Sequence, residues 1–244
     1  MIEIEREFVR HPRSVGGSYS NRHRSARVVH QLIRSAIKTG LLREGAPLSE
    51  EALVENLRTT RASVRFALHL LSEEGLVTRQ RRVGTVVRGK PIQIPVADVV
   101  DETTSGPLDY RLIGDDSFPA HGLIRSRMPT DREQLRKIEY VISSAGTPVG
   151  ILVAFQTNPH AKTFVHNPNV DDIATTFEAI YGRPFGRMQT WIDAVEADAP
   201  TAELLGISPG AQLLVRDQVL SDVDGLIHEF AYAHYRADMV SFYS

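Results

Sequence analysis

Apolar residues recur at three- and four-residue steps through the first part of the chain, a spacing that predicts helices. One apolar stripe starts at Val28, and we expect its helix to run from Ser25 to Gly40. A short second helix is expected over residues 50–57, with Ser49 as its N-cap. These two segments already indicate a helical N-terminal region.

A third helix is expected from Arg61 to Glu74, with apolar and basic positions on different faces. The segments "LVTRQ" and "TVVRG" follow as two short strands around "RRVG". Helix, helix, turn, helix and hairpin in this order are typical of a winged helix-turn-helix. The apolar face of the third helix holds Val64, Ala67, Leu68 and Leu71, and the basic face holds Arg61, Arg65 and His69.

The second half of the chain alternates between strand-like segments and short helices. The pair Asp224-Gly225 is a strong signal for a tight turn between two antiparallel strands. The pattern predicts a largely antiparallel sheet with a few helices, an α+β domain. Strands are expected at 108–114, 121–128, 134–143, 148–157, 187–197 and on both sides of Asp224-Gly225, and helices at 169–182 and 198–207.

The chain has 244 residues, which is long enough for two domains. Prolines and small polar residues in "KPIQIPVADVVDETTSG" indicate a linker between them. We expect a flexible basic arm over residues 1–24, a winged helix-turn-helix domain over 25–89, a linker over 90–106 and the α+β domain over 107–244.

Charge divides the chain in the same way. Residues 1–90 hold 17 Lys and Arg against 9 Asp and Glu, a balance of +8, and the remainder holds 11 against 21, a balance of −10, which sum to the net charge of −2. A polyanion attracts only the basic part. We therefore expect the N-terminal part to bind double-stranded DNA.

The composition excludes several classes of chemistry. The chain has no cysteine, which excludes disulfides, thiolate catalysis and cysteine-bound zinc. The histidines lack metal-site spacing, and the sequence contains no P-loop, dinucleotide-binding fingerprint or nucleophile elbow. No apolar run is long enough to cross a bilayer. We expect a cytoplasmic protein without metal or cofactor that is not an enzyme.

Arginines gather on the predicted third helix and hairpin, where guanidinium groups can reach phosphates and guanine edges. No carboxylate lies at the usual partner spacing beside Arg61 and Arg65 on that side of the helix, which favours DNA contact over a solvated surface. Gly84 would let the hairpin tip approach a groove. The candidate DNA-binding residues are Thr59, Thr60, Arg61, Ala62, Ser63, Arg65, Arg79, Arg81, Arg82 and Gly84.

Two parts of the chain resemble a known family. The stretches "IKTGLLREGAPLS", "TRASVRFALHLLSEEGLV" and "GTVV" resemble the DNA-binding domain of GntR-type bacterial transcription regulators. The segment "DAVEADAPTAELLGISPGAQLLVRDQVLSDVDGLIHEFAYAHYRAD" resembles the effector-binding UTRA domain of the HutC subfamily, whose fold is like that of chorismate lyase. The resemblance implies three partners: operator DNA, a small-molecule effector and a second copy in a homodimer.

The sequence departs from this family at functional positions. Glu51 stands where the second helix commonly carries an arginine that contacts DNA, and Arg82 stands where the hairpin commonly has a glycine. In the second domain, Glu139 or Tyr140 and Leu152 stand where an arginine and a glutamate commonly face the ligand. We expect both the DNA contacts and the ligand chemistry to differ from those of better-known members.

The resemblance places Glu229 at the effector cavity, and strand alternation puts Tyr235 on the same face. The competing interpretation is a structural carboxylate that pairs with Arg216 or Arg187. Trp191 is expected in the core. The candidate effector-binding residues are Glu229, Tyr235, Arg187, Arg125, Arg127 and Tyr140.

Together these inferences favour a ligand-responsive DNA-binding regulator, a repressor whose operator affinity changes when a metabolite binds the C-terminal domain. One alternative is a DNA-binding regulator that has lost its effector response. Another is an enzyme of chorismate-lyase-like fold, for which the sequence offers no acid/base pair or nucleophile.

Overall fold

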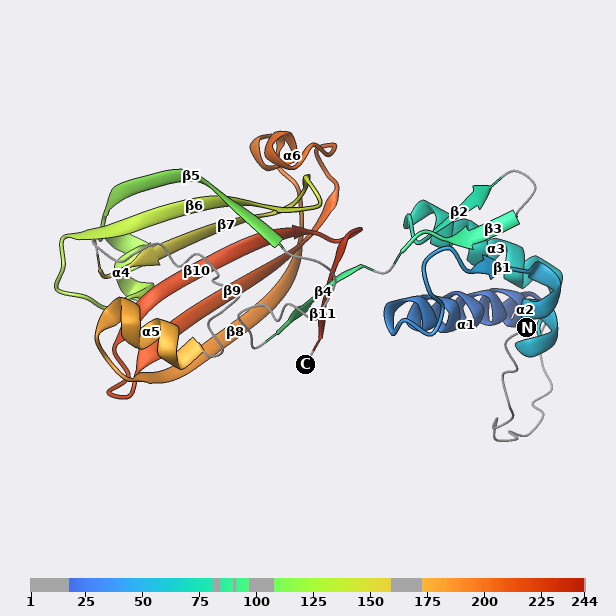
Figure 1. Cartoon of the computed structure of the whole chain (residues 1–244), viewed down its shortest axis with the longest axis horizontal. Coiled ribbons are helices and arrows are strands. Elements are labelled where there is room, and N and C mark those ends of the chain that lie inside the picture. The colour runs from blue at the N-terminus through green and yellow to red at the C-terminus, as the bar shows by residue number, and fades with distance from the viewer. Residues whose placement is uncertain (1–17, 81–83, 90, 97–107, 159–172, 244) are drawn as a thin grey trace. The chain divides into compact units, whose positions relative to one another are not determined.

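The computed structural model describes residues 18–80, 84–89, 91–96, 108–158 and 173–243. They divide into two compact units, with the boundary between Lys90 and Pro91 (Figure 1).

The N-terminal unit consists of three helices and a small antiparallel sheet with strand order β1-β3-β2. The first helix begins at Ser18, inside the segment expected as a flexible arm, and residues 1–17 lie outside the described part. The elements are α1 (Ser18–Lys38), β1 (Pro47–Leu48), α2 (Glu50–Asn56), α3 (Arg61–Glu73), β2 (Val77–Gln80) and β3 (Gly84–Val87).

The core of this unit forms where the apolar stripes of α1 and α3 meet. Ile37 of α1 and Val64 and Leu71 of α3 are fully buried in one cluster. β2 and β3 close this cluster with Val77 and Val87. The apolar stripe predicted for the third helix is confirmed.

The C-terminal unit is built on one six-stranded antiparallel sheet, with strand order β5-β6-β7-β10-β9-β8 (Figure 1). The α+β fold expected from the strand pattern is confirmed. None of the described helices is long and apolar enough to cross a membrane. The elements are β4 (Ile92–Pro95), β5 (Leu108–Pro119), α4 (Gly122–Arg127), β6 (Gln134–Ser144), β7 (Thr147–Gln156), α5 (Ile173–Tyr181), β8 (Phe185–Glu196), α6 (Ala199–Leu205), β9 (Gln212–Asp222), β10 (Ile227–Arg236) and β11 (Val240–Tyr243).

The strand expected at 121–128 is wrong, because this segment forms α4. Ile124 and Met128 lie one helical turn apart and both pack into a cluster with Phe118 and Phe155. A helix brings residues four apart to the same side, as Ile124 and Met128 are here. In a strand every second residue would be buried, but Met128 is the one fully buried residue of this segment.

The start of the segment expected as a linker is instead part of the C-terminal unit. β4 pairs in parallel with β11, and Ile92 and Ile94 are buried against Val149 and Tyr235. Residues 97–107 lie outside the described part of the chain. The two paired segments are far apart in the sequence, so no local sequence pattern predicts their pairing.

We expect Ile94→Ala to destabilise the C-terminal unit by about 2–5 kcal/mol, because the fully buried side chain leaves a cavity in the sheet core. Urea unfolding followed by the fluorescence of Trp191, the only tryptophan, reports on this unit. Leu123→Ala on α4 is the matched control: Leu123 is 89% exposed, so we expect a change within about 0.5 kcal/mol. Equal effects of the two truncations would contradict the buried role of β4.

Candidate DNA interface and effector site

α3 presents an exposed face opposite its buried stripe. Arg61, Ala62, Arg65, Phe66 and His69 are all exposed on this face. Phe66, which is 47% exposed, was not among the expected candidates, although its position outside the apolar stripe already signals an outward side chain. An exposed aromatic side chain on a recognition helix can contact a thymine methyl group.

Hydroxyl groups at the start of α3 cap the helix. Thr60 Oγ1 accepts a hydrogen bond from the Ser63 backbone N–H at 3.2 Å and lies 2.9 Å from Ser63 Oγ. Ser63 is only 3% exposed, so its side chain does not reach the surface and its expected base contact is not supported. Thr59 is half-buried beside this cap.

Two glutamates of α2 reach the arginines of α3. Arg65 Nε donates to Glu50 Oε2 at 2.9 Å, and Arg61 Nη2 donates to Glu51 Oε1 at 3.3 Å. Glu50 also lies 3.8 Å from Nη2 of Arg79 on β2. The sequence has no carboxylate at the usual partner spacing on α3, but in the folded domain the turn before α3 brings the two carboxylates at the start of α2 alongside. The absence of a carboxylate at partner spacing therefore does not leave these arginines unpaired.

Among the DNA contacts expected on the hairpin, Arg79 lies within the described residues. Arg79 extends from β2 with 80% of its side chain exposed. Gly84 begins β3 with φ of 96°, a backbone conformation that favours glycine. Arg81 and Arg82 lie outside the described residues.

Glu229 lies in a polar row that crosses three strands. On β10 it stands opposite Gln156 of β7, which stands opposite Arg136 of β6. Directly opposed residues of antiparallel strands point to the same side, which we call the Glu229 face. Glu229 Oε2 accepts hydrogen bonds from Gln156 Nε2 at 2.9 Å and from the Tyr181 hydroxyl of α5 at 2.6 Å.

Glu229 is a buried carboxylate that forms no salt bridge within the described residues. Burial raises the pKa of Glu229, and the hydrogen bonds from Tyr181 and Gln156 act in the opposite direction. The expected alternative, pairing with Arg216 or Arg187, is not formed there. Gln156 is fully buried, and its Oε1 has no hydrogen-bond partner in the described part of the chain. Because a buried acceptor without a donor is costly, this row favours a molecule that donates hydrogen bonds.

A second row brings aromatic side chains and a cation to the Glu229 face. Tyr140, Leu152 and Ala233 stand opposite one another, and Ala233 stands opposite Arg216 of β9. Arg216 Nη2 donates to the Tyr235 hydroxyl at 3.2 Å.

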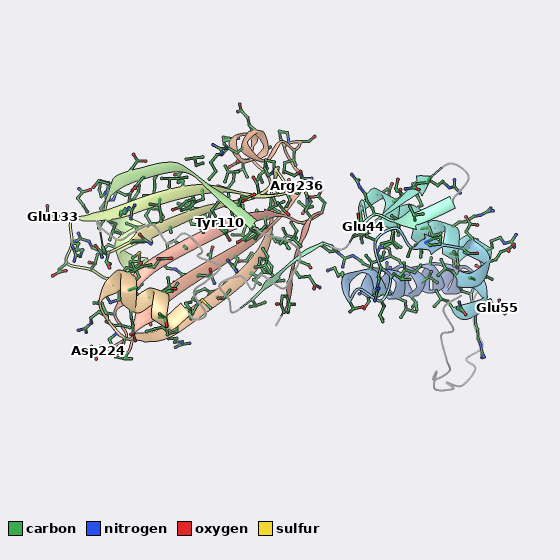
Figure 2. All side chains as sticks on the ribbon, in the orientation of Figure 1. Glu44, Glu55, Tyr110, Glu133, Asp224 and Arg236 are labelled. Atoms are coloured by element: carbon green, nitrogen blue, oxygen red, sulfur yellow. The ribbon has the colours of Figure 1, made fainter. Side chains whose placement is uncertain are left out.

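One more tyrosine, Tyr110 of β5, lies beside this row. The Tyr110 ring, labelled in Figure 2, lies on the sheet. It is 6.2 Å from the ring of Tyr140, and burial raises the pKa of Tyr110 well above its usual range. Of the expected effector residues, Glu229, Tyr140 and Tyr235 thus share one face. Glu139 points to the other side, where it pairs with Lys137 at 2.6 Å.

The arginines expected to bind an anionic effector lie elsewhere. Arg125 Nε donates to the Ala120 carbonyl at 2.7 Å, and Arg187 is exposed beside a separate hollow. The guanidinium of Arg127 lies 4.5 Å from the centre of the Trp191 ring. Trp191 is 41% exposed, so its expected place in the core is wrong. The structure does not bring these three arginines to the Glu229 face.

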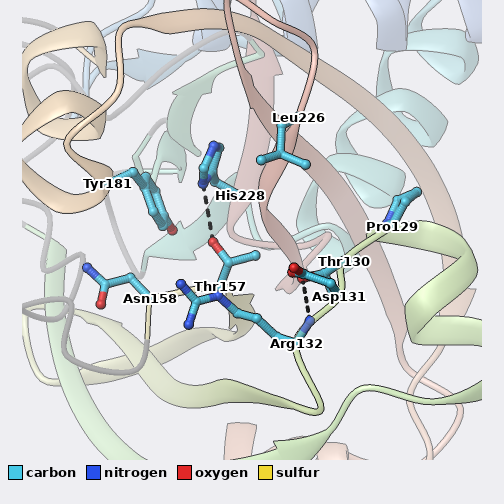
Figure 3. A pocket seen from close by; sticks show the side chains of 9 residues that line it. All are labelled: Pro129, Thr130, Asp131, Arg132, Thr157, Asn158, Tyr181, Leu226 and His228. Carbon is cyan, nitrogen blue, oxygen red and sulfur yellow. Dashed lines mark hydrogen bonds between the residues drawn. The ribbon is translucent and has the colours of Figure 1, made fainter.

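A cavity of about 660 Å³ lies at one end of the sheet, beside Tyr181 (Figure 3). His228 forms its wall, with Nδ1 3.2 Å from Thr157 Oγ1 and Nε2 3.0 Å from Asp222 Oδ2. The hydrogen bond with His228 is the main reason why the pKa of Asp222 falls to about 2. No group of three His, Cys, Asp or Glu side chains within the described ranges is placed to hold a metal ion.

This network was missed because Thr157 and His228 are far apart in the sequence. The cavity wall also includes Asn158, Arg132 and Leu226. Since the Tyr181 hydroxyl donates to Glu229, the cavity wall and the Glu229 face share one side chain.

We expect Asp222→Asn to destabilise the protein by about 1–3 kcal/mol at pH 7, because it removes the charged acceptor of His228. The folded pKa of Asp222, about 2, lies below its ordinary value of 3.8. Its stabilisation is therefore complete above about pH 4 and is lost as the pH falls towards 2.

Urea unfolding at pH 7 and pH 3 measures the difference between wild type and Asp222→Asn, which should be smaller at pH 3. Asp224→Asn in the same turn, with its side chain 69% exposed, serves as the control. A pH-independent difference would contradict this account.

Two family models match the chain. The model of the bacterial regulatory proteins of the gntR family matches residues 25–87, and the UTRA domain model matches residues 132–241. The chain is also similar to the HTH-type transcriptional regulator RB1450 of Rhizobium meliloti (strain 1021). The two are 27% identical over 223 residues, which cover 88% of this chain and 91% of RB1450.

Two solved structures share the fold. PhnF from Mycobacterium smegmatis is 22% identical with a TM-score of 0.58, over 88% of this chain and 97% of PhnF. The possible transcriptional regulator YydK from Bacillus subtilis subsp. subtilis str. 168 is 17% identical with a TM-score of 0.51, over 90% of this chain and 98% of YydK. The chain thus joins a GntR-family winged helix-turn-helix to a UTRA domain, and it is a ligand-responsive transcription regulator that binds DNA.

Proposed function

We propose that this chain is a homodimeric repressor of the HutC subfamily that acts in the bacterial cytoplasm. Two copies of α3 enter successive major grooves of a pseudo-palindromic operator. A small metabolite binds the UTRA domain and lowers the affinity of the protein for DNA. The ligand needs to favour one arrangement of the DNA-binding domains by only a few kcal/mol to change operator occupancy.

The exposed arginines at the start of α3 carry the DNA-binding half of this proposal. The side chains of Arg61 and Arg65 are 61% and 65% exposed and lie one helical turn apart. The N-terminal residues of a recognition helix are those that meet base edges. Guanidinium groups there can donate to O6 and N7 of guanine.

The Glu229 row supports an effector that bears hydrogen-bond donors. The Glu229 carboxylate and the buried Oε1 of Gln156 are both acceptors. Hydroxyl or amino groups on a small polar metabolite would satisfy them. Tyr140 and Leu152 stand on the same face in place of a charged pair, so aromatic and apolar contacts replace part of the ionic recognition.

The homodimer is supported by the edge strand β8. Ile192 and Val195 on this strand are 38% and 37% exposed. An exposed edge strand with apolar side chains readily meets a second chain. We place the subunit interface at this edge of the UTRA domain.

We expect Arg61→Ala and Arg65→Ala each to weaken operator binding by about 1–3 kcal/mol, or roughly 5- to 150-fold, because each removes a bidentate donor to a base. Fluorescence anisotropy on a duplex that the wild type selects from a random library measures the change. Arg43→Ala in the exposed connector before α2 is the control and should bind like wild type. If both helix variants bind as tightly as wild type at moderate salt, α3 is not the recognition helix.

We expect Glu229→Gln to weaken effector binding at least about tenfold while leaving operator affinity intact, because the variant loses a charged acceptor. Thermal-shift screening of sugars, amino sugars, sugar phosphates and carboxylates identifies a stabilising compound, and calorimetry then compares variants. Glu139→Gln is the matched control on the opposite face of the sheet. If no compound stabilises the wild type, the chain is a regulator that has lost its effector response.

A further inference from the structure

The arginines of the proposed DNA surface are already partly neutralised by the protein. Arg61, Arg65 and Arg79 contribute three positive charges, and the carboxylates of Glu50 and Glu51 offset two of them. For a surface that meets a polyanion this is a cost, because carboxylates repel phosphates. The arrangement therefore needs a physical reason.

Fold stability does not supply that reason for the Glu51–Arg61 pair. The side chain of Glu51 is 82% exposed and that of Arg61 is 61% exposed. Ion pairs this exposed contribute little to stability, because water and salt screen them. Glu50 differs, since its side chain is 23% exposed and lies between Arg65 and Arg79. Glu51 is thus the better probe of function.

The geometry of the pair separates the charge of Arg61 from its hydrogen-bond donors. Only Nη2 of Arg61 donates to Glu51, at 3.3 Å. A guanidinium has five N–H donors, so most of them stay available to a base. Non-specific affinity for DNA comes from net charge and counterion release, whereas sequence recognition comes from donors aimed at base edges.

We propose that Glu51 is a specificity-determining residue of the DNA-binding surface. By cancelling the charge of Arg61 it lowers affinity for all duplexes, and by leaving the donors available it preserves the contact with the correct base. The result is a larger ratio of specific to non-specific affinity. This inference rests on the proposed contact of Arg61 with DNA.

The test compares Glu51→Gln with Glu55→Gln in the full chain. Glu55 lies one turn later on α2, is exposed and forms no ion pair within the described residues, so both variants lose one negative charge (Figure 2). Binding is measured over a salt series to the duplex selected by the wild type and to a scrambled duplex of the same composition. Thermal unfolding checks that both variants are folded.

For Glu51→Gln we expect affinity for the scrambled duplex to rise about 3- to 10-fold at 0.1 M salt, with a salt slope steeper by up to about 0.9. Affinity for the selected duplex should rise less, so the specificity ratio falls. Glu55→Gln should change both affinities less and leave the ratio unchanged. In an Arg61→Ala background, Glu51→Gln should no longer alter the ratio.

Two results would overturn the inference. Equal effects of Glu51→Gln and Glu55→Gln would show that only bulk charge matters, and so would an effect of Glu51→Gln that persists without Arg61. Failure of the proposed function looks different: the wild type itself would then bind the selected and scrambled duplexes equally well, and the inference would fall with it.

Discussion

Burial of the apolar stripe of α3 is the constraint on which the proposed DNA-binding surface depends. Val64 and Leu71 are fully buried against α1, which fixes the rotation of the helix about its axis. Once that rotation is fixed, Arg61 and Arg65 must point outward. The Thr60 cap sets where the helix begins, and so places both arginines in its first two turns. The charge pattern of the surface therefore follows from the packing of the core.

Alternation along β10 has the same consequence in the second unit. The sheet must bury one side of each strand against a neighbouring layer, and successive residues then point to opposite faces. Glu229 and Tyr235 come to one face, but a β-bulge between Ile227 and Glu229 interrupts the alternation at His228. Tyr181 therefore contacts both neighbours, with its ring 5.1 Å from that of His228. Tyr181 of α5 donates to Glu229 and also lines the cavity beside His228. A ligand that moves this tyrosine would act on both groups at once.

What the sequence predicts well is local. The apolar stripe of α3 and the turn at Asp224-Gly225 are each encoded by residues close together in the sequence, and the structure contains both. What it misses depends on contacts between distant segments. Glu50 pairs with Arg65 on the helix after the next turn, and Gln156 pairs with Glu229 on the neighbouring strand. No sequence spacing predicts either pair. The pairing of β4 with β11 escapes prediction for the same reason, because parallel strands need a long connection.

The partial neutralisation of the arginine surface also bears on regulation. A protein whose non-specific affinity is low depends more heavily on the few contacts that require correct placement of both recognition helices. A misplaced helix loses its base contacts. The attraction between the protein's positive charges and the phosphates is then too weak to hold the protein on DNA. A modest bias from the UTRA domain is enough to release such a protein, whereas a strongly basic surface would keep it bound in either arrangement. Under the proposed function, charge balance at Glu51 and ligand binding at Glu229 would act on the same quantity, the difference between specific and non-specific affinity for DNA.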